Sequence, residues 1–182
     1  MENVFKSTLF ISLLMTGSAN AAFIDAYDIS NWSQSTNGGS IDISGAPDTV
    51  DLTSSNDDSG AEKNQELTIT ALENADISFA WNFQTHDLLN VYDPFGMLLN
   101  GVFTQLTDNL GNSNQSGVFS FNVVTGDIFG FRANSIDSMS GSSITDISAF
   151  NAVPTSVPIP ATFWLMGSSL MYLLCKKRKS IV

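Results

Sequence analysis

Apolar and polar residues alternate through the middle of the chain, and this period of two is typical of β-strands with one buried face. The alternation is clearest over residues 67–83, where it predicts one half-buried strand in which Trp81 points inward. The same period recurs at 119–123 and 129–133, on either side of a turn at 125–127. Further strands are predicted over 40–44, 49–54 and 144–150.

The spacing between these strands predicts an all-β fold. Asn100-Gly101 stands between the apolar pairs 98–99 and 102–103, which is the strongest short-range signal for a β-hairpin with a type I′ turn. No stretch keeps a 3.6-residue apolar stripe for three helical turns. About eight short strands favour a jelly-roll-like antiparallel β-sandwich, with a closed barrel as the alternative. The thirteen phenylalanines of the chain supply ample side-chain volume for a core.

Apolar segments at the two ends of the chain are predicted to be targeting signals. Residues 1–21 match a secretory signal peptide, with Lys6, an apolar run at 9–15 and a small-x-small cleavage site at 19–21. At the other end, residues 161–175 carry no charge and precede a basic cluster. This order predicts a transmembrane helix with the basic cluster in the cytoplasm, and an acidic ectodomain (22–152) on the far side of the membrane.

The C-terminal residues 153–182 resemble the PEP-CTERM class of sorting signals, in the variant with a VPLPA box. The resemblance implies recognition by exosortase, a membrane-embedded peptidase, which removes the tail during delivery to the cell surface or extracellular matrix. Ile159 stands where the founding motif carries Glu. The matching residues are Val157, Pro158, Ile159, Pro160 and Ala161, then Trp164 to Ser168, then Lys176, Lys177, Arg178 and Lys179.

Residues 31–150 also resemble an ectodomain that recurs among PEP-CTERM proteins. The matching runs include Asn31-Trp32, 44–47, 92–96 and 126–131. The resemblance implies a β-sandwich of unassigned activity.

The charge of the ectodomain excludes one class of partner. Between Ala22 and Val157, Lys63 and Arg132 face 17 acidic residues. A surface this acidic repels phosphate backbones, so nucleic-acid binding is not expected. Cys175 is the only cysteine, which excludes an intramolecular disulfide, a zinc finger and a redox CxxC pair.

Few residues are candidates for chemistry, and no catalytic site is predicted. The single histidine, His86, has no nucleophile beside it in a recognisable motif. Asp87 and Asp93, which flank Tyr92, are the best carboxylate pair for a glycosidase, but nothing in the sequence marks either pKa as shifted. Asp57 and Asp58 form a weak candidate site for Ca²⁺, which competes with the simpler interpretation of a solvated acidic turn.

Together these features predict a non-catalytic exported protein of the cell surface or extracellular matrix. One alternative is a carbohydrate-binding or adhesion module of the exopolysaccharide matrix, in which Trp32 or Tyr92 stacks on sugar rings. A second is a permanently anchored type I membrane protein whose tail is never removed. An enzyme ranks below both. The expected partners are exosortase, the membrane and, for the first alternative, exopolysaccharide.

Overall fold

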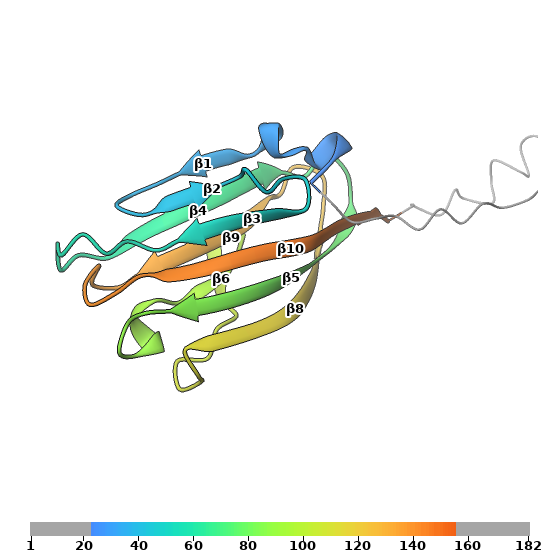
Figure 1. Cartoon of the computed structure of the whole chain (residues 1–182). Coiled ribbons are helices and arrows are strands. Elements are labelled where there is room, and N and C mark those ends of the chain that lie inside the picture. Colours follow the sequence, from blue (N-terminus) through green and yellow to red (C-terminus); the bar gives the residue numbers. More distant parts are fainter. Residues whose placement is uncertain (1–22, 156–182) are drawn as a thin grey trace, which may run out of the picture.

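The chain folds into two five-stranded antiparallel sheets over residues 23–155, which are the residues that a computed structural model describes. The first sheet contains, in spatial order, β1 (Ser33–Ser35), β4 (Lys63–Thr70), β9 (Ile128–Ser135), β6 (Phe95–Leu99) and β7 (Val102–Gln105). The second contains β2 (Ser40–Asp42), β3 (Thr49–Thr53), β10 (Ser143–Pro154), β5 (Ala75–Thr85) and β8 (Asn114–Val123). Figure 1 shows the two sheets as layers. The predicted sandwich is therefore confirmed, and the closed barrel is wrong because each sheet keeps two edge strands.

The two ends of the sandwich differ. Both ends of the described chain lie at one end, together with the short 3₁₀ helices η1 (Asp25–Tyr27) and η2 (Ile29–Asn31) (Figure 1). The opposite end, called the distal end below, carries the loops 86–94, 106–113 and 136–142, with η3 (Asn90–Tyr92) in the first of them. Backbone hydrogen bonds tie these loops to the strand ends, as in Thr85 N to Ser113 O at 2.9 Å.

The core lies between the sheets and is rich in aromatic rings. The inward residues of β5, from Ile77 to Phe83, are each at most 7% exposed, so the inward orientation predicted for Trp81 is confirmed. Phe23 stacks on Phe150 with ring centroids 4.8 Å apart. Burying an apolar side chain of this size contributes about 1.5–3 kcal/mol. These contacts hold the two sheets together without a disulfide.

The predicted hairpin is confirmed between β6 and β7. Leu99 pairs with Val102 across the turn. Asn100 has φ of 51° and Gly101 has φ of 81°, the positive values that a type I′ turn requires at both central residues.

The alternation over 67–83 belongs to two strands rather than the one predicted. The chain leaves β4 after Thr70, crosses to the other sheet and enters β5 at Ala75. The odd-numbered residues face the core in both strands, so the apolar positions stay in phase across the crossing. The turn at 125–127 likewise joins β8 and β9 in different sheets. The two crossings pair with each other, because Ala71 N donates to Asp127 O and Gly126 N donates to Ala71 O, each at 2.8 Å.

The predicted signal peptide and the predicted sorting signal lie outside the described residues, apart from residues 153–155. Within residues 23–155, no helix has both the length and the apolar character needed to cross a membrane.

Candidate functional site

Trp32 lies in the core, which corrects the expectation that it stacks on sugars. The side chain is 6% exposed, and its ring stacks on Phe131 with centroids 5.6 Å apart. The indole N–H donates to Tyr27 O at 3.0 Å. One face of the ring and its polar edge are therefore occupied by the protein itself, and the side chain as a whole is buried.

Tyr92 lies at the distal end, where η3 leaves it 36% exposed. Its backbone oxygen accepts a hydrogen bond from Ile136 N at 2.8 Å, which anchors η3 to the neighbouring loop. The ring thus stays available at the surface.

The acidic turn with Asp57 and Asp58, the weak calcium candidate of the sequence, lies between β3 and β4, and a lysine pairs with one of its two carboxylates. Asp57 is paired with Lys63, and this hydrogen-bonded ion pair lowers the pKa of Asp57 to about 2. Among residues 23–155, no group of three or more His, Cys, Asp or Glu side chains is placed to hold a metal ion. The lysine therefore already supplies the positive charge that this turn would take from a cation.

Asp93 is fully buried, so it cannot pair with Asp87 as a glycosidase carboxylate open to substrate. Its two oxygens accept hydrogen bonds from Ser54 Oγ at 2.8 Å and Thr85 Oγ1 at 2.7 Å. Burial raises the pKa of Asp93, more than these hydrogen bonds lower it. His86 is nearby in sequence, and its Nδ1 lies 3.2 Å from the backbone oxygen of Ser142.

The outer face of the second sheet presents two rows of mostly polar side chains, which run across all five strands. The strand register sets the members of each row opposite one another. Adjacent strands lie about 4.8 Å apart, so each row offers a new side chain at that interval. The first row is Ser40, Thr53, Ile144, Gln84 and Asn114, and the second is Asp42, Asp51, Asp146, Asn82 and Ser116.

A depression of about 440 Å³ follows the half of these rows that crosses β10, β5 and β8. Gln84, Asn114, Asn82 and Ser116 are all exposed there. Asn82 Nδ2 lies 3.4 Å from Asp146 Oδ1, which links β5 to β10 across the floor of the depression. Amide side chains both donate and accept hydrogen bonds, so the depression matches a ligand that carries hydroxyl groups.

Three carboxylates of the second row lie side by side on β2, β3 and β10. They belong to Asp42, Asp51 and Asp146. Burial raises the pKa of Asp51, and the neighbouring carboxylates of Asp146 and Asp42 raise it further. The cations of the described residues, Lys63 and Arg132, are on strands of the first sheet, where they pair with Asp57 and Glu66. Within residues 23–155, the row therefore keeps an uncompensated negative charge.

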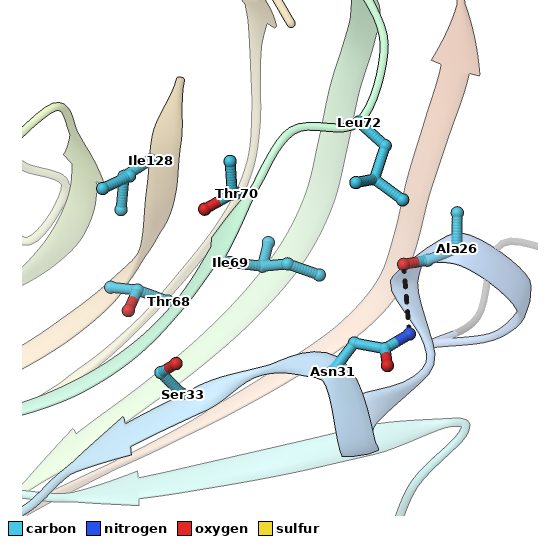
Figure 2. Close-up of a pocket in the computed structure, with 8 residues that line it drawn as sticks. All are labelled: Ala26, Asn31, Ser33, Thr68, Ile69, Thr70, Leu72 and Ile128. Atoms are coloured by element: carbon cyan, nitrogen blue, oxygen red, sulfur yellow. Dashed lines mark hydrogen bonds between the residues drawn. The ribbon is translucent and has the colours of Figure 1, made fainter. Parts of the chain in front are cut away.

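A second hollow, of about 430 Å³, lies beside the end of β4 on the first sheet. Figure 2 shows its lining: Thr68, Ile69, Thr70 and Leu72 on one side, Ile128 next to them, and the η1–η2 segment opposite. Asn31 Nδ2 lies 3.4 Å from Ala26 O and holds that segment in its arched shape. The lining contains hydroxyl and aliphatic groups, and none of the described residues that form it is charged.

The sequence predicted the inward face of β5, although it merged this strand with β4, and it missed the depression on the outer face. The polar residues Ser78, Asn82 and Gln84 alternate with the apolar ones, so their outward orientation was available from the period alone. Their neighbours on β8 and β10 come from segments at least 30 residues further along the chain. Only the strand register brings these groups together.

Comparison with known proteins adds three distant structural likenesses. No family model and no curated protein matches the sequence. The structure of TmCBM61 in complex with β-1,4-galactotriose has a TM-score of 0.35 and 12% identity, covering 75% of this chain and 97% of that chain. CBM28, a carbohydrate-binding module specific for non-crystalline cellulose, has a TM-score of 0.35 and 10% identity, covering 75% and 95%. The enzymatically active domain of tailspike protein 4 of bacteriophage CBA120 has a TM-score of 0.37 and 13% identity, covering 74% and 21%. Values this low carry no conclusion about the ligand or the activity of this chain, whose fold rests on the strands described above.

Proposed function

We propose that this chain is a non-catalytic polysaccharide-binding protein, whose ligand lies across the outer face of the second sheet. The observation that carries the proposal is the depression where Gln84 and Asn114 of one row adjoin Asn82 and Ser116 of the next. Four exposed hydrogen-bonding side chains on two adjacent strands offer donors and acceptors in a fixed grid. A polymer of sugar rings presents hydroxyl groups along its length and fits such a grid.

The same face argues against catalysis. Cleavage of a glycosidic bond needs a carboxylic acid and a second carboxylate on opposite sides of the bond. Of the residues that the structure describes, Asp146 is the one carboxylate that lines the depression. The proposed role is therefore to hold a glycan without changing it.

We also propose that the protein is exported and sorted by its C-terminal signal. The order of the Val157–Ala161 box, the uncharged segment and the basic cluster supports this proposal. Intact mass spectrometry of the protein from its host tests it. Loss of the 22 residues after Pro160, with the product outside the inner membrane, is the expected result. A full-length protein in the inner membrane would instead support the permanently anchored alternative.

Affinity gel electrophoresis tests the binding face. Wild-type protein isolated from its host is run through gels that contain soluble β-1,4-glucan, β-1,4-galactan or dextran, and the polymer that retards it is used for the variants. The double substitution Gln84→Ala and Asn114→Ala removes hydrogen bonds of about 0.5–1.5 kcal/mol each, so affinity should fall roughly 5- to 150-fold.

The matched control is the pair Ser78→Ala and Ser120→Ala. These residues face each other on the same two strands, but outside the depression. The control should bind like the wild type. Equal retardation of both double variants, or no retardation of the wild type by any polymer, would overturn the proposed site.

A further inference from the structure

A second groove lies at the distal end, and aliphatic side chains form much of it. It has a volume of about 670 Å³ and lies between the β5–β6 loop and the β7–β8 loop. Leu89 and Val91 line it from the first loop, and Leu110 lines it from the second. Leu89 is 57% exposed and Leu110 is 95% exposed. Exposed apolar side chains that gather in one hollow with a polar rim are a feature of interaction sites.

Side-chain hydrogen bonds hold both walls of the groove in place. Asn90 is buried, and its Nδ2 donates to Gly111 O at 2.6 Å and Asn112 O at 2.9 Å, which ties the first loop to the second. Gln115 accepts from Asp108 N at 2.7 Å and donates to Asp108 O at 2.9 Å. Because these hydrogen bonds fix the loops to each other, the backbone of the groove is preorganised for a partner.

The charge around the groove selects the kind of partner. Asp108 lines the groove, and Asp87 lies on the first loop next to Leu88, which is itself 88% exposed. The cations Lys63 and Arg132 of the described residues are engaged elsewhere, with Asp57 and Glu66. A second copy of this acidic domain would bring like charge to the contact, which costs association. A partner with positive charge beside its apolar residues would gain from the same field.

We propose that the distal groove docks a protein segment that inserts an aliphatic side chain between Leu89 and Leu110 and places Lys or Arg next to Asp108. The proposal stands apart from the polysaccharide site, because different residues line the two depressions. The groove also lies at the end opposite the described chain ends, so a protein tethered through residues beyond Thr155 would present it outward (Figure 1).

Two synthetic amphipathic peptides test the proposal. They share the same leucine positions, and their remaining positions carry Lys in one and Glu in the other. Binding to the protein isolated from its host is measured by fluorescence anisotropy at physiological ionic strength. The Lys peptide should bind, and the double substitution Leu89→Ser and Leu110→Ser should weaken it by roughly tenfold or more. Asp108→Asn should weaken the Lys peptide a few-fold and reduce its salt dependence, while the amide oxygen can still accept from Leu110 N.

The matched control is Val102→Ser. Val102 is 67% exposed on the β6–β7 hairpin, outside the groove, so its loss should leave binding unchanged. Thermal melting of each variant checks that the fold is intact. Equal binding of the Glu peptide, or undiminished binding of the Lys peptide to the leucine double variant, would overturn the proposal. A wild-type dimer in sedimentation that the leucine double variant abolishes would assign the groove to a second copy and overturn it as well.

Discussion

The hydroxyl of Thr85 donates to Asp93 Oδ2 at 2.7 Å and accepts a hydrogen bond from the backbone N–H of Asp87 at 3.0 Å. Ser54 repeats this arrangement, since it donates to Asp93 Oδ1 at 2.8 Å and accepts from Ser143 N at 2.8 Å. One buried carboxyl group thus joins the ends of β3 and β5 to the start of β10. The β5–β6 loop, which forms one wall of the distal groove, begins at this junction.

The first prediction concerns the pH dependence of stability. Burial raises the pKa of Asp93 above its usual 3.8, so the folded state holds the proton more tightly than the unfolded chain does. The resulting stability is fully present below the unfolded pKa and is lost as pH rises through the folded pKa. Asp93→Asn removes this pH-dependent loss of stability, because the amide does not ionise. Urea unfolding from about pH 3 to about pH 7 should therefore show the wild type losing its advantage over the variant as pH rises.

Thr85→Val is the companion to this substitution. It removes a hydrogen bond to the ionised carboxylate, worth about 1.5–3 kcal/mol, and leaves Asp93 buried. Its destabilisation should therefore be larger near neutral pH than in acid. A wild-type advantage over Asp93→Asn that stays constant across the pH range would contradict the assigned cause.

The second prediction concerns the carboxylate row on the second sheet. Asp51 lies in register with Asp42 on one side and Asp146 on the other. Replacing it with Asn removes repulsion, so Asp51→Asn should stabilise the protein at neutral pH by about 0.2–1 kcal/mol, a value limited by exposure to solvent. The gain should shrink in high salt, because screening weakens the repulsion that the substitution relieves.

Asp48→Asn is the control for the charge change alone. Asp48 is exposed and lies outside the row. It should change the melting temperature less than Asp51→Asn at low salt. Equal effects of the two substitutions would mean that net charge, rather than the row, sets the gain.

Most strands could be predicted from the sequence, because burial of one face is recorded directly in the alternation of residues such as Ile77 and Phe79. The assignment of strands to sheets could not. A strand that crosses to the opposite layer keeps its apolar phase, so β4 and β5 appear as one element. The hairpin at Asn100-Gly101 was predictable because its turn chemistry is local.

The candidate sites were harder to predict than the fold. Trp32 and Tyr92 were both candidates for sugar stacking, yet only Tyr92 reaches the surface, since Trp32 fills the space beside Phe131. Asp93 looks like an ordinary loop carboxylate until the three-dimensional structure encloses it with hydroxyl groups. The environment of such a residue depends on side chains that are far away in the sequence, so no local sequence pattern reveals it.

The third prediction separates packing from sugar stacking at Trp32. Trp32→Ala should destabilise the protein by about 3–5 kcal/mol, because it empties a core site between Phe23, Phe129 and Phe131. Trp32→Phe keeps an aromatic ring but leaves Tyr27 O without its donor, so it should cost less. Any polysaccharide affinity should survive Trp32→Phe in the folded fraction. If a fully folded Trp32→Phe variant lost polysaccharide affinity, Trp32 would have to contact the ligand, contrary to this prediction.

The last prediction compares two glycines that are required for different reasons. Gly101 has a positive φ of 81°, but a Cβ there would meet no atom within 4 Å. Gly101→Ala should therefore cost only the strain of the left-handed conformation, about 1–2 kcal/mol. Gly130 pairs with Thr68, and a Cβ there would come 2.0 Å from the backbone oxygen of Leu67. Because a backbone atom cannot rotate away as a side chain can, Gly130→Ala should force β4 and β9 apart and cost about 3 kcal/mol or more. Urea unfolding of the two variants side by side gives the comparison, and a smaller loss for Gly130→Ala than for Gly101→Ala would show that β4 and β9 are not packed as closely as described.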